Sequence, residues 1–315
     1  MPAHIAAGVD GSLESLAAAD WAAREALLRG APLRLVHAWQ WPARVGGVRP
    51  TDDTQQEWAE RLLEEAREHL TGLHPDLTVT ADLLPDTPAP ALLGAAGRAE
   101  LLALGSRGLG GLTGFLLGST ALEVLAGAER PVVLVRPGEQ GEEPSRTAAA
   151  HREVVLGLDP REACDEVIEF AFAAADRRRV PLRAVHSWNA PWTAPPRHPV
   201  LASHTYAGGQ PSPAVDPRHE EDARLALADA LKPWREKFPA VEVTEDAVRG
   251  RAGHHLVEAA DAAGLLVIGR RVRDADRPPG RRSAHLGAVA HAVIHHARCP
   301  VAVVPHTAER AEGSR

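Results

Sequence analysis

The sequence predicts an α/β protein built from two tandem, doubly wound domains, each with a five-stranded parallel sheet. Three observations support this fold class: a length of 315 residues, motifs that recur at a constant offset, and short apolar runs that alternate with segments of helical periodicity. A typical domain has roughly 100 to 150 residues. The length therefore favours two domains over one.

The repeat is visible in two short motifs of the first half. Gly8–Asp10 and Pro32–Trp39 recur at Gly157–Asp159 and Pro181–Trp188, both at an offset of 149 residues. Towards the end of each half the offset grows to 164 and then 169 residues, so the second copy carries insertions of 15 and 5 residues. The first insertion falls in a Pro/Gly/His-rich stretch, which is typical of an irregular loop.

The domain boundary is expected at a polar, acidic segment that contains Pro and Gly, a composition typical of a solvated linker. We place the first domain at residues 1–137, the linker at 138–150, the second domain at 151–306 and a tail at 307–315.

Apolar runs and helical segments alternate along the first copy. Strands are expected at residues 4–9, 33–39, 77–84, 101–104 and 132–135, with helices at 12–29, 55–73, 89–99 and 120–128. This alternation implies βαβ crossovers and a parallel sheet that is buried on both faces. Ligands of such sheets bind beyond the carboxyl ends of the strands, where the strand order reverses. Asp10, His37 and Gly105 would share that crevice if the first and fourth strands are neighbours.

Composition excludes several classes of protein. The net charge of -7, without a basic cluster interleaved with aromatic residues, argues against a nucleic-acid partner. No apolar run of about 20 residues is present, and the first residues lack a secretion-signal pattern, so we expect a cytoplasmic protein with no membrane partner. The only two cysteines, Cys164 and Cys299, are interpreted as buried apolar side chains.

A glycine-rich segment follows the fourth expected strand and leads into a helix at Ser119. Glycine lets backbone amides approach an anion, and a helix N-terminus directs free N–H groups and a positive dipole at the same place. Ser119 could cap this helix or bind a phosphate oxygen. The segment is therefore interpreted as a phosphate-binding loop. A plain connecting loop is the alternative, because a glycine-rich loop alone is weak support.

Two common phosphate loops do not fit the spacing. Walker A needs a lysine before Ser119, and a dinucleotide fingerprint needs G-x-G-x-x-G after the first strand; both are missing. The spacing present is G, two residues, G, nine residues, G-S, at Gly105, Gly108, Gly118 and Ser119.

This spacing resembles that of the universal stress protein family, in its tandem, actinobacterial-like type. Asp10 at the end of the first strand and a closing P-V-x-V-V-like strand in each copy extend the resemblance over both halves. The resemblance implies five parallel strands per domain and binding of ATP with Mg²⁺, with Asp10 on the adenosine part and Ser119 on the phosphates. The ATP-binding residues that it implies are Asp10, Gly105, Arg107, Gly108, Gly118, Ser119 and Thr120. For Arg107, a solvated turn residue is an equal alternative.

The second copy departs from the glycine pattern. Val272 stands where the second glycine belongs, and Ala288 lacks the hydroxyl group of Ser119. Weak or absent ATP binding is expected there, and a weaker second site would comprise Asp159, Gly269, Arg271 and Gly287. The alternative is that a cluster of arginines attracts phosphate without glycine geometry. These are Arg270, Arg271, Arg273, Arg277, Arg281 and Arg282.

Histidines offer few catalytic or metal-binding patterns. His291 and His295 are four residues apart on an expected helix but lack the acidic partner of zinc proteases, so no metal site is expected. His37 and His186, at equivalent strand ends, are interpreted as structural rather than ligand-binding.

The function expected is that of an ATP-binding regulatory or stress-response module and not an enzyme. A slow ATPase or phosphotransferase that uses the same loop is the alternative, disfavoured because no Walker B Asp or assigned base is found. A scaffold with a purely structural nucleotide is a third option. An unidentified regulatory protein is the expected partner. The closing strands, at 131–135 and 300–304, are expected to pair as an internal pseudo-dimer, and a homodimer of the whole chain stays open.

Overall fold

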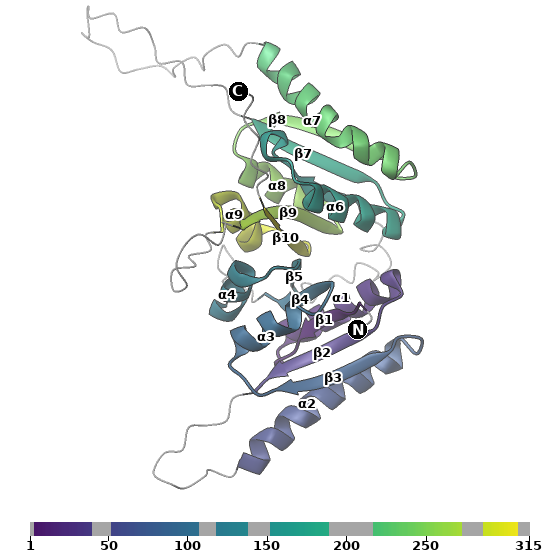
Figure 1. Cartoon of the computed structure of the whole chain (residues 1–315), viewed down its shortest axis with the longest axis vertical. Coiled ribbons are helices and arrows are strands. Elements are labelled where there is room, and N and C mark those ends of the chain that lie inside the picture. Colours follow the sequence, from purple (N-terminus) through teal and green to yellow (C-terminus); the bar gives the residue numbers. More distant parts are fainter. Residues whose placement is uncertain are drawn as a thin grey trace, which may run out of the picture.

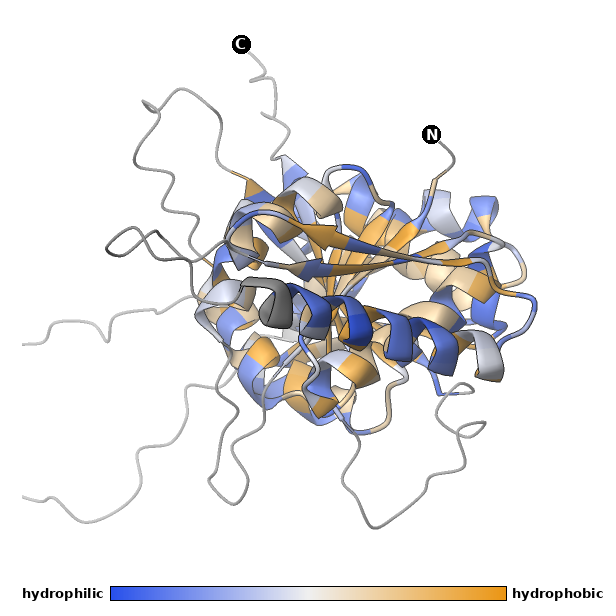
Figure 2. Ribbon diagram, turned by 90° about the horizontal axis from the view of Figure 1, so that it is seen from below, coloured by the Kyte–Doolittle hydropathy of each residue, from blue (hydrophilic) through white to orange (hydrophobic). Residues whose placement is uncertain are grey.

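The computed structural model describes residues 3–39, 52–106, 118–137, 152–188, 217–272 and 286–307. These residues form two α/β halves that share one ten-stranded sheet, which runs through the molecule along its longest axis (Figure 1). Figure 2 shows that hydrophobic residues gather along the strands, while the surrounding helices carry the hydrophilic ones outward.

The described residues of the first half form five strands and four helices. The strands are β1 (Ile5–Gly8), β2 (Leu33–Ala38), β3 (Val79–Leu84), β4 (Leu101–Gly105) and β5 (Val132–Val135). The helices are α1 (Leu13–Arg29), α2 (Asp52–Leu73), α3 (Pro88–Ala96) and α4 (Ser119–Gly127). Every element expected from the sequence is present, and the bounds differ by at most three residues. Local signals account for the ends of α1: the Ser12 side chain caps its start, and Gly30 ends it in the left-handed conformation at φ 62°.

The second half repeats this order. Its strands are β6 (Val154–Gly157), β7 (Leu182–Trp188), β8 (Val243–Arg249), β9 (Leu265–Val272) and β10 (Val301–Thr307). Its helices are α6 (Asp165–Arg178), α7 (Pro217–Lys237), α8 (Ala252–Ala260) and α9 (Ala288–His296), with a short 3₁₀ turn, η1 (Pro160–Glu162), ahead of α6.

The sheet has the order β3-β2-β1-β4-β5-β10-β9-β6-β7-β8. Within each half all neighbouring strands are parallel, and β1 pairs with both β2 and β4, which confirms the expected reversal of strand order at the first strand. The two closing strands pair antiparallel, with Val133 opposite Ala302, which confirms the pairing expected from their sequences.

Each face of the sheet is covered by helices from both halves. Alternate residues along β1 show why: Ile5 and Ala7 belong to the core under α1, α2, α6 and α7, while Ala6 belongs to the core under α3, α4, α8 and α9. This period-two alternation of buried residues on both faces is what a parallel sheet between two helical layers requires.

Side chains also join the halves. Arg136, just after β5, donates from Nη2 to the carbonyl oxygen of Ile294 in α9 at 2.7 Å. Arg270, on β9, donates from Nη1 to the carbonyl oxygen of Ala126 in α4 at 3.0 Å, and from Nη2 to that of Ala128. The C-terminal ends of α4 and α9 are therefore each bound by an arginine of the other domain, where a positive charge is favourable.

Candidate functional site

The turn after β1 presents Asp10 at the carboxyl edge of the sheet. The Asp10 carboxylate accepts hydrogen bonds from the backbone N–H of Ser12, at 3.0 Å, and from the Ser12 hydroxyl. Gly11 lies at φ +81°, and a Cβ there would come within 2.7 Å of Leu62 Cδ1. Positive φ and close contact together require glycine at this position, so the turn has a fixed shape. Asp10 itself stays exposed.

His37 supports this turn from the neighbouring strand. Its Nδ1 lies 2.6 Å from the carbonyl oxygen of Val9, and His186 makes the equivalent contact with Leu158 at 3.1 Å. A carbonyl oxygen only accepts hydrogen bonds, so Nδ1 carries the proton in both rings. The structural role expected for these histidines is consistent with the same contact in both copies.

Close packing explains why residue 105, at the end of β4, is a glycine. A Cβ at this position would lie 2.6 Å from the carbonyl oxygen of Glu14 and 2.7 Å from the backbone nitrogen of Ser15. The first turn of α1 rests directly on the backbone of Gly105, which only a glycine permits. The close approach of α1, rather than phosphate geometry, therefore explains this first glycine of the loop pattern.

Helix α4 begins without a side-chain cap. Gly118 is the N-cap residue, no side chain caps it among the described residues, and the first turn contains no acidic residue. The expectation that Ser119 could cap the helix is wrong, because Ser119 is the first helical residue and not the N-cap. Arg107 and Gly108 lie outside the described residues. Thr120 follows Ser119 in the first turn of α4.

The sheet brings these elements to one edge. Because β1 and β4 are parallel neighbours, with Ala7 opposite Ala103, the Asp10 turn and Gly105 emerge side by side. The chain returns from α4 into β5, which pairs with the other side of β4. The described members of the expected ATP site thus belong to adjacent segments at the carboxyl ends of β1 and β4.

The equivalent edge of the second domain is built differently. The Asp159 carboxylate accepts from the backbone N–H of Arg161 at 3.1 Å and so starts η1. Cys164 occupies the repeat position of Ser15, and its Sγ lies 2.8 Å from Nδ1 of His306. Burial, together with the nearby Glu166 carboxylate, raises the pKa of the Cys164 thiol, and burial lowers the pKa of His306. Both shifts favour the neutral thiol and the neutral imidazole.

Side chains of the second domain occupy the space beside its first loop glycine. A Cβ on Gly269 would come within 3.0 Å of the His306 ring, and Arg271 forms an ion pair with Glu162. Val272 is the last residue of β9 and pairs with Thr307, so β9 continues three residues beyond Gly269, whereas β4 ends at Gly105. At the start of α9, Gly287 is the N-cap residue.

Arg270 does not belong to a phosphate-attracting cluster. Its side chain is buried and donates to carbonyl oxygens near the end of α4. Arg270 is therefore not free to attract phosphate, as the alternative of an arginine cluster in the second copy would require. Arg271 is engaged by Glu162. The remaining arginines of that cluster, from Arg273 onward, lie outside the described residues.

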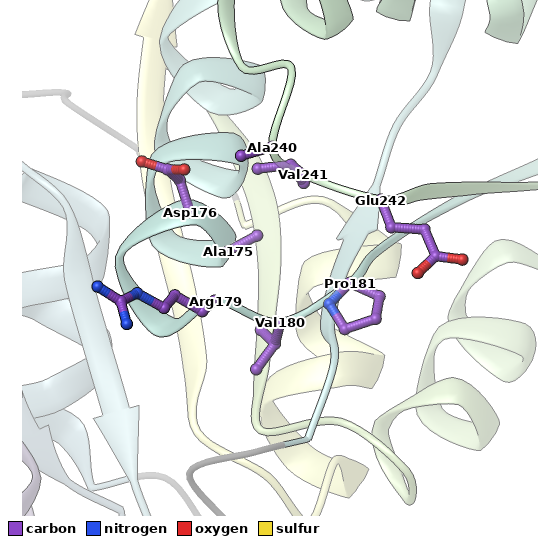
Figure 3. Close-up of a pocket in the computed structure, with 8 residues that line it drawn as sticks. All are labelled: Ala175, Asp176, Arg179, Val180, Pro181, Ala240, Val241 and Glu242. Atoms are coloured by element: carbon purple, nitrogen blue, oxygen red, sulfur yellow. The ribbon is translucent and has the colours of Figure 1, made fainter.

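A small hollow lies at the opposite edge of the second domain. Figure 3 shows it between the end of α6, with Asp176 and Arg179, and the segments that lead into β7 and β8, with Pro181 and Glu242. These residues stand at the amino ends of the strands, so the hollow is separate from the edge that carries Asp159.

The described part of the chain contains no group of three or more His, Cys, Asp or Glu side chains placed to hold a metal ion. The rings of His291 and His295 lie 4.3 Å apart, centroid to centroid.

No helix among the described residues combines the length and apolar character needed to cross a lipid bilayer.

Sequence comparison agrees with this architecture. The universal stress protein family matches residues 1–136 and again residues 151–305. The chain belongs to the universal stress protein family. A universal stress protein of Mycolicibacterium smegmatis is 34% identical over 309 residues, which cover 95% of this chain and 96% of that protein.

This chain is similar to solved structures of universal stress proteins. One from Archaeoglobus fulgidus covers 96% of this chain and 98% of its own, with a TM-score of 0.68 at 17% identity. Another from the same organism, solved in complex with dAMP, is 25% identical and covers 42% of this chain and 97% of its own, with a TM-score of 0.32.

Proposed function

We propose that this universal stress protein binds ATP in its first domain and acts as a regulatory, stress-response module. The observation that carries the proposal is the start of α4 at Gly118 and Ser119, which, like the start of α9, has neither a capping side chain among the described residues nor an acidic residue in its first turn, but which is not accompanied by covering side chains such as His306 in the part of the first domain that is described. The glycine spacing of the loop that leads into this helix supports the same assignment.

The start of α4 suits a phosphate group for simple reasons. The first N–H groups of a helix have no partner within the helix, and the helix dipole adds a partial positive charge there. A Cβ on Gly118 would meet nothing within 4 Å, so the approach to these amides is open on that side among the described residues. Ser119 and Thr120 add two hydroxyl groups.

Mg²⁺ would accompany the nucleotide rather than occupy a site of its own. Mg²⁺ binds through phosphate oxygens, water and one or two protein oxygens. The start of α4 offers the hydroxyls of Ser119 and Thr120 as oxygen donors near the phosphates. Bound in this way, the ion would neutralise part of the phosphate charge.

The second domain is proposed to bind ATP weakly or not at all. His306 covers Gly269, and Arg271 is held by Glu162, so a phosphate would have to displace both groups. β9 also continues as strand through Val272, so the position that corresponds in sequence to the second loop glycine is part of the sheet.

Matched glycine variants test the assignment. Gly118→Val and Gly287→Val place the same side chain at the N-caps of α4 and α9, and at both positions a Cβ meets nothing within 4 Å, so both variants should fold. Titration calorimetry with ATP and Mg²⁺ should show at least a tenfold loss for Gly118→Val, roughly 1.4 kcal/mol, and no loss for Gly287→Val. An unchanged Gly118→Val variant, with binding abolished by Asp159→Ala, would place the competent site in the second domain.

The proposal assigns no efficient turnover to the protein. The alternative, a slow ATPase or phosphotransferase, uses the same edge of the sheet and differs in rate. A steady-state assay with purified protein decides between them, because a rate above about one per second, in the range of typical enzymes, would contradict a purely regulatory role. A regulatory protein partner and a homodimer of the whole chain belong to the same proposal, and pull-down with and without ATP tests the first.

A further inference from the structure

An exposed tryptophan stands beside the candidate site of the first domain. Trp58, near the start of α2, is 51% exposed, whereas the exposed fraction is 7% for Trp21 and 8% for Trp234. Its ring meets the ring of His37 edge-on, with centroids 6.1 Å apart and planes at 74°. The indole therefore has a neighbour near the end of β2, while about half of the side chain stays open to solvent.

Trp58 lies close to residues that contact the turn containing Asp10. His37 binds the carbonyl oxygen of Val9, the residue before Asp10. Leu62, one helical turn after Trp58, lies against Gly11 in the same turn. The first turns of α2 thus flank the ends of β1 and β2, on the side of the sheet that α1 and α2 cover.

The strand order predicts how a bound nucleotide would be oriented along this edge of the sheet. Phosphates at the start of α4 lie beyond β4, and the next strands in the sheet are β1 and then β2. A nucleotide that extends along this edge places its base over the ends of β1 and β2. On the basis of the function proposed above, we propose that Trp58 is a specificity-determining residue on whose indole face the base stacks.

The two domains differ at the position of Trp58. At the offset of 164 residues, the buried pair Ala59 and Leu63 of α2 corresponds to the buried pair Ala223 and Leu227 of α7. The same alignment puts Asp222 at the position of Trp58. The domain whose first loop glycine is covered by His306 is therefore also the domain that has a carboxylate at the position of Trp58.

Stacking on an indole has a defined chemical consequence. Every base has a π face, so the contact is tolerant of base identity. It distinguishes a nucleotide from a bare polyphosphate, but not adenine from guanine. Trp58 would therefore contribute affinity for ATP and none for inorganic triphosphate.

The experiment uses the full chain with three changes: Trp58→Asp, which installs the residue of the second copy, Trp58→Phe, which keeps an aromatic face, and Trp21→Phe, which alters a buried tryptophan. ATP and inorganic triphosphate are titrated into each variant by calorimetry, and tryptophan emission is followed in parallel. Trp58→Asp should weaken ATP binding about tenfold and leave triphosphate binding unchanged. Trp58→Phe should retain most of the affinity, and ATP should quench the emission of wild type and of Trp21→Phe more than that of Trp58→Phe, which still has Trp39 after β2.

The outcomes separate this proposal from the function on which it rests. Absence of ATP binding to the wild type would overturn the proposed function and this proposal with it. ATP binding that is equal in wild type and Trp58→Asp would overturn the stacking role alone. Equal losses for ATP and triphosphate would also overturn it, because they would show general damage to the site.

Discussion

Glu25 of the first domain and Arg178 of the second form a buried ion pair that joins α1 to α6. The Glu25 side chain is 1% exposed, and its other oxygen accepts from Nε of Arg29 at 2.6 Å. Burial raises the pKa of Glu25, but the charges of Arg178 and Arg29 and the hydrogen bond from Arg29 outweigh it, so the pKa lies below its usual value. The carboxylate is therefore ionised where the two domains meet.

Removal of this carboxylate should destabilise the protein strongly. Glu25→Ala leaves Arg29 and Arg178 buried without their shared partner, and breaking a buried pair in this way costs about 3 to 5 kcal/mol. Urea unfolding measures the loss. Glu64→Ala, which breaks the exposed Glu64–Arg67 pair, is the control and should have little effect. Equal unfolding midpoints for the two variants would contradict the assignment.

The same carboxylate predicts a pH dependence of stability. A group whose pKa is lower in the folded state stabilises the fold above its unfolded pKa, and the contribution is lost as pH falls through the folded pKa. For Glu25 the contribution should be complete above its ordinary value of 4.5 and decline below it. Thermal midpoints of wild type and Glu25→Gln, compared over this range, should converge as the pH falls. A constant difference down to strongly acidic pH would refute the prediction.

Arg270 should contribute to the pairing of the domains. Its guanidinium supplies two donors and a positive charge to the C-terminal end of α4, whose last turn contains no basic residue. Because hydrogen bonds from a charged donor contribute about 1.5 to 3 kcal/mol, Arg270→Ala should lower the free energy of unfolding by about 2 kcal/mol. Arg224→Ala, which breaks the exposed Arg224–Glu220 pair on α7, should leave it nearly unchanged. Small-angle scattering of Arg270→Ala should also show a looser domain pair, and unchanged compactness and stability would argue against this role.

Two glycines should respond to alanine with opposite signs. Gly105→Ala forces a Cβ against the backbone of Glu14, and overpacking of this kind costs about 1 to 3 kcal/mol. Gly94→Ala, inside α3, meets nothing within 4 Å and should stabilise by about 0.5 to 1 kcal/mol. Thermal unfolding of the two variants gives the comparison, and a stabilised Gly105→Ala variant would show that α1 does not rest on β4 as described.

Both thiols should be slow to react in the folded protein. Burial raises the pKa of Cys299 to about 12, and burial and Glu166 raise the pKa of Cys164. Since the thiolate is the reactive form, an aromatic disulfide reagent should label neither cysteine quickly in the native state and both in urea. Fast labelling of one native thiol, mapped by mass spectrometry to Cys164, would mean that the contact with His306 activates it.

Local features of the sequence were sufficient for the elements and the family. Apolar periodicity reflects which side of a helix or strand is buried, so segments such as Leu13–Arg29 could be predicted to within a few residues. The constant offset between the copies showed two domains, and the spacing from Gly105 to Ser119 showed the resemblance that the family match bears out.

Only the tertiary structure decided what individual side chains in the two crevices do. Gly105 is a glycine because α1 packs on it, and the ring of His306 covers Gly269 because β10 continues beyond Val304, the residue that pairs with Gly269. Trp58 could be interpreted beside His37 only once α2 had been placed on the sheet. Each contact joins residues that are far apart in the chain, and their distance depends on how whole elements pack, which local periodicity does not encode.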